Sequence, residues 1–460
     1  MRFPTLSVIE RAQYLLMATL PAYARTAPIP RPVLEAVLCR LDVDRHLVDL
    51  LDRVRDRNLG LPVWAGRSLL LLSPRYVRRV LGGSDILYSP DTDRNRTAYA
   101  ALAPGLVTLA RDRTRMLRRD ATESMLDTKN PGSAMAGRFA ATAADEIDAM
   151  LDGPVRTGIL QWSDLRSAFD RAGRRCVLGD AARDDLTVTA LVTRLSRRPN
   201  RHGRRRAEQW KSELDERIAR YADDPHPSSL LGRIADGPSD GDLLDQVPYW
   251  LLSTSYVAPI AAHALALLAT HPRDFARVME ELADAERHHG AATPEAIAAQ
   301  PYLQAAITEA ARLWPSVPTV SRVTTRPVSW ESVPVEPGTN LVVDLRYQAR
   351  SRRGGSYANR FAPHQWLDGS LDADWTILPF GAGRGGCAGA MLGVHLAVAG
   401  ASTILRRCFL RAIAPTWAPD RPLPVTHSPA DVRFAVASRP EAALSGASIT
   451  SETILGETDD

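Results

Sequence analysis

The sequence predicts a mainly α protein with a small β region, folded as a single domain. Helical periodicity runs through most of the 460 residues, with apolar side chains recurring at steps of three and four. β-branched runs are few, and the sequence contains neither an internal repeat nor a convincing interdomain linker. With 45% hydrophobic residues, a chain of this length can bury a sizeable core.

The helical pattern is clearest in five segments. In chain order they are Leu34–Arg55, Arg138–Leu151, Asp164–Leu178, Arg206–Tyr221 and Asp274–His288. The segment Val247–Thr270 is strongly apolar, but Pro248, Pro259 and His263 interrupt it, and charged helices flank it closely. We therefore expect a buried central helix there rather than a membrane span, with a kink at Pro259 that frees a backbone carbonyl.

Three short runs indicate strands: Leu61–Trp64, Val328–Val335 and Leu341–Leu345. We expect the turn Glu336-Pro337-Gly338-Thr339 to join the last two. The polar, acidic segment Ser445–Asp460 is typical of a disordered tail. The expected organisation is one domain over residues 1–444, followed by this tail.

Composition narrows the classes of function. The net charge of +4 is small for this length and gives no indication of nucleic-acid binding. The apolar run at residues 15–20 ends at Pro21, far short of the ~20 residues of a membrane span, and no secretory signal is evident. Four scattered cysteines favour a reducing cytoplasm. Lysine occurs only at Lys129 and Lys211 among many arginines, which is typical of a high-G+C bacterial genome.

One cysteine stands inside a glycine-rich loop, Phe380-Gly381-Ala382-Gly383-Arg384-Gly385-Gly386-Cys387-Ala388-Gly389, ahead of the helix-compatible segment Met391–Leu405. Glycines let the backbone pass close to a flat ring, where a Cβ would clash. Backbone N–H groups can hydrogen-bond the sulfur, and the positive end of the following helix is expected to lower the thiol pKa. The pattern suits a thiolate ligand to a haem iron, with Cys387 as the ligand and Phe380 shielding the sulfur. A glycine-rich turn around a merely buried cysteine is the alternative.

This loop resembles the cysteine loop of the cytochrome P450 superfamily. The positions in register are Phe380, Gly381, Gly383, Cys387 and Gly389. The resemblance extends over roughly residues 60–440 and implies the family's helix-rich fold, haem b (iron protoporphyrin IX) as cofactor and Cys387 as its iron ligand. Where the family has Arg or His, two residues before the cysteine, this chain has Gly385, and the neighbouring Arg384 is the expected substitute.

A second motif lies on the predicted helix Pro301–Trp314, where Glu309 and Arg312 are three residues apart and can pair. By its order and distance from the cysteine loop, the pair resembles the Glu-x-x-Arg motif that the family buries beside its haem. The family adds an arginine from a Phe-x-Pro-x-Arg segment, but here Gln365 stands at that position. We expect the Gln365 amide to hydrogen-bond Glu309, and Arg350 or a neighbouring arginine to help balance the charge.

Two arginines are candidates for binding the haem propionates, which would be costly to bury without cations. Arg322, ten residues past Arg312, falls where the family places a propionate-binding arginine. Arg118 resembles the arginine of the helix that crosses the other edge of the haem. The alternative for each is a solvated surface arginine.

The helix that activates oxygen in the family departs from the usual pattern. Counting back from His271-Pro272, which matches the family's end-of-helix signature, Ser255 takes the place of the acid and Tyr256 that of the threonine. In the family this pair relays protons to bound dioxygen. Here Tyr256 could donate a proton or a radical, Ser255 could hold a water, or the substrate could supply the hydroxyl. Tyr256 could equally just pack, and a shift of one residue would bring Ser255 or Thr254 near the iron.

A basic stretch at residues 197–206 lies, by order, between the two helices that roof the substrate channel in this fold. It is either a solvated loop or a docking patch for an acidic substrate, an acidic carrier domain or a redox partner. Interleaved aromatic residues are lacking, so nucleic acid is not expected to bind there.

The resemblance implies a cytoplasmic haem-thiolate monooxygenase that oxidises a small organic molecule, in bacterial secondary metabolism. A separate ferredoxin and ferredoxin reductase would supply the electrons. The missing acid at Ser255 keeps open a peroxide-dependent or oxygen-independent haem-thiolate enzyme. The departures at Gly385, Gln365 and the relay positions keep open a non-catalytic partner that activates another biosynthetic enzyme, although a pure scaffold has no need of Cys387.

Overall fold

The structure, a computed structural model, describes residues 2–440 apart from 24–30, 129, 131–132, 197–203, 237–242, 291–292, 370–374 and 376. The predicted tail at 445–460 and most of the basic stretch at 197–206 lie outside the described residues.

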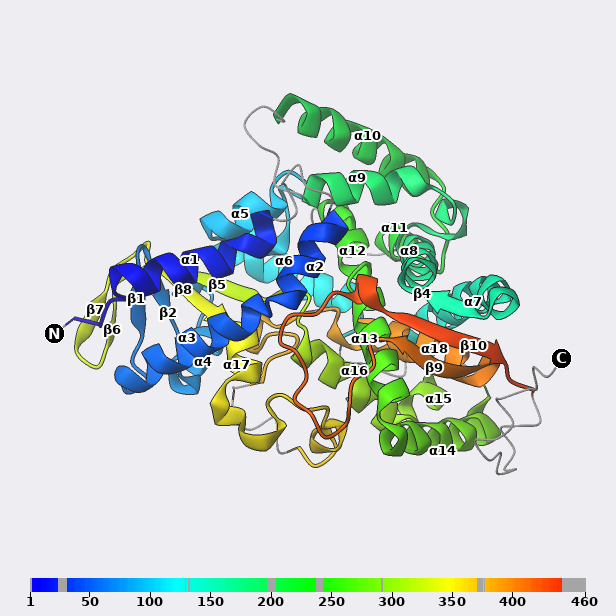
Figure 1. Cartoon of the computed structure of the whole chain (residues 1–460). Coiled ribbons are helices and arrows are strands. Elements are labelled where there is room, and N and C mark those ends of the chain that lie inside the picture. The colour runs from blue at the N-terminus through cyan, green and yellow to red at the C-terminus, as the bar shows by residue number, and fades with distance from the viewer. Residues whose placement is uncertain are drawn as a thin grey trace.

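The fold is mainly α with small sheets, as predicted (Figure 1). The first helices are α1 (Val8–Tyr23), α2 (Arg31–Arg40), α3 (Val43–Arg57), α4 (Pro74–Leu81), α5 (Asp93–Tyr99), α6 (Asp112–Met125), α7 (Ala134–Thr157), α8 (Trp162–Leu178) and α9 (Leu186–Ser196). They are followed by α10 (Arg204–Asp223), α11 (Leu230–Asp236), α12 (Val247–Thr254), α13 (Val257–Thr270), α14 (Pro272–His289), α15 (Pro294–Ala298), α16 (Pro301–Leu313), α17 (Leu345–Arg350) and α18 (Ala390–Arg407).

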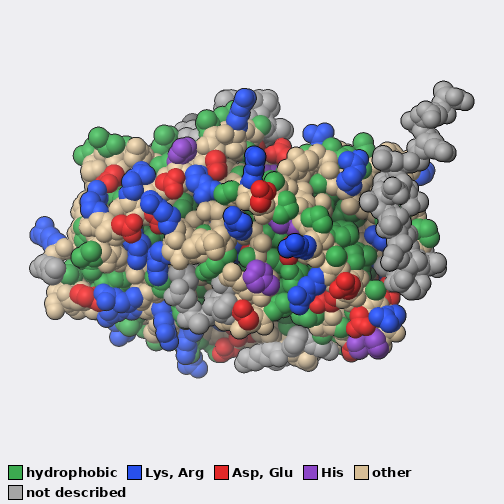
Figure 2. Space-filling view, turned by 60° about the horizontal axis from the view of Figure 1, so that its bottom comes forward, with side chains coloured by type: hydrophobic (Ala, Val, Ile, Leu, Met, Phe, Trp, Pro, Cys, Tyr) green, Lys and Arg blue, Asp and Glu red, His purple; other side chains and the backbone are tan. Residues whose placement is uncertain are grey.

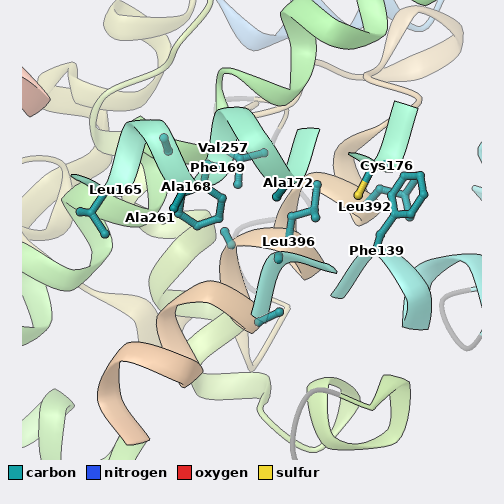
Figure 3. Close-up of a cluster of buried hydrophobic side chains, with 14 of the residues drawn as sticks. Phe139, Leu165, Ala168, Phe169, Ala172, Cys176, Val257, Ala261, Leu392 and Leu396 are labelled. Carbon is teal, nitrogen blue, oxygen red and sulfur yellow. The ribbon is translucent and has the colours of Figure 1, made fainter. Parts of the chain in front are cut away.

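The main hydrophobic core is built where α7, α8, α13 and α18 pack together (Figure 3). Phe139, Phe169, Val257 and Leu396 are among its buried side chains. The helices approach closely at a glycine: a Cβ on Gly400 of α18 would lie 2.5 Å from the Phe169 ring of α8. Since interiors are close-packed, this contact fixes α18, and with it the loop that precedes it.

The strands are β1 (Val63–Ala65), β2 (Ser68–Leu70), β3 (Tyr88–Ser89), β4 (Ile159–Gln161), β5 (Thr319–Thr324), β6 (Val328–Trp330), β7 (Val333–Val335), β8 (Asn340–Asp344), β9 (Cys408–Ala414) and β10 (Arg433–Ser438). The larger sheet has the order β1-β2-β8-β5-β3 and lies opposite the helical half in Figure 1, while β4-β10-β9 form a second sheet. Strand β6 pairs with β7 as a hairpin, and β8 pairs with β2 and β5. The predicted run at 328–335 is therefore a hairpin rather than one strand.

The central apolar segment is buried and interrupted. Within the described residues, Leu244–Thr270 is long and apolar enough to cross a membrane, but it lies in the core, and Figure 1 shows it running through the middle of the protein. Ser255 and Tyr256 separate α12 from α13, and their N–H groups bond three residues back, to Leu252 and Ser253. Pro259 has no N–H to offer the Ser255 carbonyl four residues earlier, which explains the interruption. The predicted buried helix and its kink are both found.

Candidate functional site

The cysteine loop is fixed at its base and pressed against a neighbouring helix. The Cys387 N–H donates to the carbonyl of Phe380 at 2.8 Å. Gly381 and Gly383 have φ angles of 72° and 63°, which favour glycine. A Cβ on Gly383 would lie 2.0 Å from the carbonyl oxygen of Leu81, at the end of α4. The backbone can follow this path only because glycine stands at that position.

Cys387 has an unusual environment, since its side chain is exposed while its surroundings are dense enough for burial to raise the thiol pKa. The Gly389 N–H and the Arg119 guanidinium favour the thiolate, but burial outweighs them. The expectation that the loop and helix would lower the thiol pKa is therefore wrong for the protein alone, whereas a metal ion deprotonates a coordinating thiol.

Arg322, on β5, is a buried cation without a carboxylate partner among the described residues. It is 5% exposed, and its Nη1 donates to the carbonyl of its neighbour Ser321 at 3.0 Å. Burial and the nearby Arg115 and Arg119 of α6 lower the pKa of Arg322 to about 10. Three guanidinium groups thus lie close to one another; Arg115 pairs with Asp85 and Arg119 with Glu123, which leaves Arg322 as the cation that suits an anionic ligand.

Gly385 leaves room for the Arg322 guanidinium. A Cβ on Gly385 would lie 1.8 Å from Nη2 of Arg322. Arg322 therefore occupies the space that a larger residue at 385 would need. Arg384, the substitute expected from the sequence, is exposed instead. The correction is that a cation from β5, rather than the next residue of the loop, lies beside position 385.

Arg118 and Arg119 of α6 are adjacent in the sequence but bond different segments of the chain. Nη1 of Arg118 donates to the carbonyl of Gly105 at 2.7 Å, so Arg118 holds the loop before α6. Nη1 of Arg119 donates to the carbonyl of Gly386, in the cysteine loop, at 2.8 Å, and Arg115 pairs with Asp85 at 2.9 Å. The structure therefore places Arg115 and Arg119, not Arg118, beside Arg322. The spacing of 115 and 119 on one helix face is the sequence signal that could have found them.

Glu309 and Arg312 of α16 form a fully buried ion pair with two N–H···O contacts of 2.6 Å. The Glu309 carboxylate also accepts hydrogen bonds from the Ala362 N–H at 3.0 Å and from Nε1 of Trp366 at 2.9 Å. The indole of Trp366 is thus a donor to Glu309 that the sequence did not predict. The pair ties α16 to the segment that leads towards the cysteine loop.

Arg350 does not reach Glu309. Its guanidinium donates to Asn359 and to the carbonyls of Leu313 and Leu423, at 2.9–3.0 Å. Burial and the nearby Arg312 lower the pKa of Arg350. Arg350 therefore hydrogen-bonds neutral oxygens, and it interacts with Glu309 through charge alone.

The interruption between α12 and α13 carries hydroxyls whose protons are engaged. Ser255 donates to the carbonyl of Leu252 at 2.6 Å, and Thr254 donates to Leu251 at 2.9 Å. Thr254 also packs against α8, because a Cβ on Gly173 would lie 2.4 Å from its Oγ1. Thr254 is therefore turned towards α8, and Ser255 is free to accept, but not to donate, a hydrogen bond.

Two tyrosines that sequence reasoning missed lie near the predicted Tyr256. Tyr249 of α12 and Tyr99 of α5 meet edge to face, with ring centroids 5.3 Å apart and an interplanar angle of 86°. Burial raises the pKa of Tyr249, and Tyr99, Tyr256 and Cys387 raise it further through their charges. These phenols therefore lie within electrostatic reach of Cys387. The spacing of 249 and 256, two helical turns, is the signal that could have linked them.

A cavity of about 550 Å³ borders the start of the cysteine loop. Trp366, Phe380 and Met391 line it, together with His395 of α18. His395 is buried, and its Nδ1 has no hydrogen-bond partner in the described structure. The first residues of the cysteine loop, Phe380, Gly381 and Ala382, therefore border this hollow.

These residues fit a haem. The group needs an accessible thiol, cations for its propionates and glycine where the backbone runs beneath the ring. Cys387 supplies the thiol, and the glycines of its loop supply the close approach. Arg322 supplies a buried cation that has no salt-bridge partner among the described residues, although the charge of Asp85 acts on it.

The fold and the loop define the class of haem-thiolate proteins, and comparison with known proteins agrees. Residues 258–423 match the model of the family Cytochrome P450. The structure of a cytochrome P450 named CYP102L1 superposes with a TM-score of 0.69 at 19% identity, covering 85% of this chain and 94% of that one. The cyanobacterial CYP120A1, solved with retinoic acid bound, gives 0.67 at 14% identity, covering 81% of this chain and 89% of that one. Residues 258–423 thus match the Cytochrome P450 family, whose cofactor is a haem iron, and the superpositions show the same fold over most of the chain.

Curated relatives match over shorter lengths. Cytochrome P450 93B2 of Gerbera hybrida is 37% identical over 103 residues, covering 21% of this chain and 20% of that protein. The mitochondrial 1,25-dihydroxyvitamin D(3) 24-hydroxylase of Mus musculus is 26% identical over 195 residues, covering 40% of this chain and 37% of that protein. The chain thus matches less than half the length of these relatives.

Proposed function

We propose that this protein is a haem-thiolate monooxygenase that oxidises a small organic molecule, in bacterial secondary metabolism, with haem b as cofactor. The observation that carries the proposal is the accessible Cys387, held on a glycine loop whose Gly385 contacts the buried Arg322. The names of several relatives support it, among them the methyltetrahydroprotoberberine 14-monooxygenase of Papaver somniferum.

When bound, haem supplies the redox chemistry, because iron held by a thiolate favours cleavage of the O–O bond. In this proposal Sγ of Cys387 binds the iron, and the Gly389 N–H stabilises the negative sulfur. Arg322 and Arg119 hold the two propionates through charge-assisted hydrogen bonds. The Glu309–Arg312 pair keeps the surrounding framework rigid, since both groups are fully buried and bonded.

Proton supply must differ from that of family members with a carboxylate at the helix interruption. Oγ of Ser255 can accept a hydrogen bond from a water but has its own proton engaged with Leu252. Tyr256 is partly accessible and could pass a proton to such a water through its phenol. A peroxide-dependent reaction is the second candidate. Hydrogen peroxide already contains both oxygen atoms with their protons, so no relay has to deliver protons to bound dioxygen.

Electrons would come from a ferredoxin, itself reduced by a ferredoxin reductase. The outer hollow beside the loop and the exposed Arg384 support docking of an acidic donor at this side. On the face shown in Figure 2, by contrast, basic and acidic side chains are mixed. An acidic carrier domain remains a further candidate partner, but the basic stretch proposed for it lies largely outside the described residues.

The test compares two oxidants, dioxygen with an electron supply and hydrogen peroxide, on a panel of candidate small molecules. Purified protein is supplied either with NADPH, ferredoxin reductase and ferredoxin, or with hydrogen peroxide, and the oxidised product is measured. A monooxygenase shows product with the redox proteins that depends on dioxygen. Product with peroxide alone favours the second candidate. If a panel of small molecules gives no product under either condition, the monooxygenase proposal fails and the non-catalytic partner is favoured.

A further inference from the structure

The cavity beside the cysteine loop is bordered by two helices, α16 and α18. The helix residues that line it are Gln304, Thr308, Ala390, Met391, Val394 and His395. Those of α18 form two pairs of residues four apart, so they share one side of that helix. Cys387 and Arg322, which the proposed function assigns to the haem, do not line this cavity. The cavity is therefore a candidate site for a second ligand.

The described lining is uncharged and rich in aromatic rings. Trp366, Trp375 and Phe380 border the cavity, and among the described residues no Asp, Glu, Lys or Arg does so. Trp366 is held in place, because its Nε1 donates to the buried Glu309 at 2.9 Å. Ligand sites commonly combine apolar walls, a few polar groups and a volume of about 300–1,000 Å³. The cavity, of about 550 Å³, thus suits a small aromatic molecule, whereas a charged one would find no described partner of opposite sign.

His395 is a polar group that the structure leaves unsatisfied at this cavity. It is 6% exposed, and its Nδ1 has no hydrogen-bond partner among the described residues. Burial lowers the pKa of His395, so the ring is neutral at neutral pH. A neutral imidazole has one donor and one acceptor nitrogen, and an unpaired buried polar group costs free energy. A ligand hydroxyl both donates and accepts, so it can bond the ring in either tautomer.

We propose that the cavity between α16, α18 and the start of the cysteine loop binds a small, uncharged aromatic molecule that carries one hydroxyl group. The aromatic ring of this ligand packs against Trp366 and Trp375, and its hydroxyl hydrogen-bonds the imidazole of His395. The inference goes beyond the proposed function, because it assigns a ligand to a second site and does not depend on the oxidation of a substrate.

Three probes that share one ring and one methyl group test the selection on the haem-loaded, full-length protein. They are p-cresol, toluene, which lacks the hydroxyl, and the anion p-toluate. We expect p-cresol to bind about tenfold more tightly than toluene, from the usual net strength of a hydrogen bond. We expect p-toluate to bind at least about tenfold more weakly than p-cresol, because its charge is buried without a partner. Calorimetry measures the three dissociation constants without relying on the haem spectrum.

Variants then locate the binding site. His395→Leu removes the hydrogen-bonding group and should abolish the preference for p-cresol over toluene. Thr308→Phe fills the cavity from α16 and should weaken the binding of both probes at least about tenfold. His289→Leu, at an exposed position of α14, is the matched control and should keep wild-type affinities. If His395→Leu does not fold, Thr308→Phe tests the site alone.

The proposal is overturned if wild-type protein binds none of the probes, or binds toluene or p-toluate as tightly as p-cresol. It is also overturned if His395→Leu keeps the wild-type preference, or if Thr308→Phe binds p-cresol as tightly as wild type does, since the probes would then occupy another place. The carbon monoxide absorption spectrum of the same reduced samples reports whether Cys387 ligates the iron, so failure of the proposed function is read separately.

Discussion

Gly385 and Arg322 come from distant parts of the chain and lie in close contact. We expect haem retention to depend on both residues. Arg322→Gln removes the buried cation, and Gly385→Ala places a methyl group 1.8 Å from the guanidinium nitrogen. We expect either change to weaken haem binding at least about tenfold, because a charge-assisted bond of about 1.4 kcal/mol or more is lost. The ratio of haem to protein absorbance after purification measures the effect.

A substitution at Arg384 tests which cation serves at position 385, Arg322 as in the structure or Arg384 as the sequence predicted. The side chain is exposed and adjacent to Gly385, so Arg384→Gln should leave haem content unchanged. Loss of haem in Arg384→Gln together with full retention in Arg322→Gln would contradict the assignment.

We expect the protein to lose stability when the buried Glu309–Arg312 pair on α16 loses one of its charges. Glu309→Gln leaves the Arg312 guanidinium buried without a counter-charge, which typically costs about 3–5 kcal/mol. We expect a large fall in melting temperature and in soluble yield. Glu280→Gln, at an exposed position of α14, provides the matched control and should change stability by less than about 0.5 kcal/mol. Equal melting temperatures for the two variants would show that the pair is dispensable.

Motif residues could be placed from the sequence because their spacing is local, whereas side-chain direction across elements could not. Cys387, Glu309 and Arg312 follow from short patterns within one loop or one helix. The choice of Arg119 over Arg118 depends on how α6 packs against the cysteine loop. The same limit explains why Trp366 was not foreseen as a donor to Glu309.

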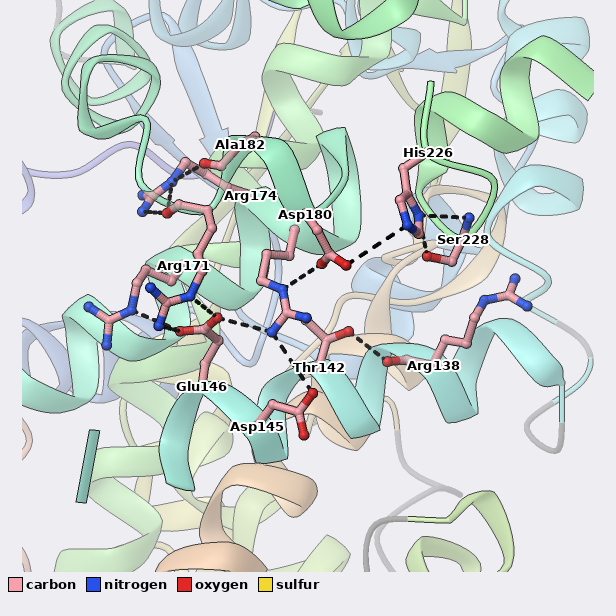
Figure 4. Close-up of polar contacts among 12 residues, drawn as sticks. Arg138, Thr142, Asp145, Glu146, Arg171, Arg174, Asp180, Ala182, His226 and Ser228 are labelled. Atoms are coloured by element: carbon pink, nitrogen blue, oxygen red, sulfur yellow. Dashed lines mark hydrogen bonds and ion pairs between the residues drawn. The ribbon is translucent and has the colours of Figure 1, made fainter. Parts of the chain in front are cut away.

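At the scale of elements, α7 and α8 are joined by a cluster of arginines around one carboxylate (Figure 4). Glu146 of α7 is buried and accepts from Arg171 and Arg175 of α8 and from Arg183 beyond it, at 2.7–3.0 Å. These hydrogen bonds lower the pKa of Glu146 despite its burial. The carboxylate therefore acts as the common anchor of the two helices.

Glu146→Gln should lower the free energy of unfolding by about 3 kcal/mol, because three guanidinium groups lose their shared anion. The melting temperature at neutral pH checks this. Since the folded-state pKa is lowered, the stabilisation is present above the ordinary carboxyl pKa and is lost as the pH falls through the folded value. Asp145→Asn, at the adjacent and exposed carboxylate, should have little effect. A wild-type melting temperature in Glu146→Gln would refute the anchoring role.

Long, strongly periodic elements were predictable, and short or composite ones were not. The segments at 164–178 and 274–288 correspond to α8 and α14, whose patterns are amphipathic throughout. The segment Leu34–Arg55 is divided between α2 and α3, because Asp42 adopts a left-handed conformation that a continuous pattern does not reveal. Strands β3 and β4 contain only two and three residues and depend on distant partners, so no local signal marks them.

At the scale of the whole molecule, a histidine pair joins the central helix to the C-terminal region. Nε2 of His263 lies 3.0 Å from Nδ1 of His427, and Trp314 and Trp417 pack around them. Burial lowers the pKa of His427 to about 4 and, with His427 nearby, lowers that of His263. Both rings are therefore neutral in the folded protein over a pH range in which they would be charged when unfolded.

Stability should accordingly fall as the pH drops below the ordinary histidine pKa of about 6.5. The unfolded state binds more protons between about pH 6.5 and 4, so the loss grows by up to about 1.4 kcal/mol per pH unit for each ring. Melting temperatures at pH 7.5 and pH 5 measure it. His427→Phe should reduce the difference between the two, while His289→Gln, on an exposed turn of α14, should not. An unchanged difference in His427→Phe would contradict the assignment.

The account depends most directly on the bond between the sulfur of residue 387 and a haem iron. The decisive measurement is the absorption spectrum of reduced protein under carbon monoxide, for wild type, Cys387→Ser and the control Cys39→Ser, which alters a cysteine outside the loop. We predict the strongly red-shifted band of thiolate ligation in wild type and Cys39→Ser, and its loss in Cys387→Ser. A red-shifted band that survives in Cys387→Ser, or is absent from haem-loaded wild type, would contradict the account.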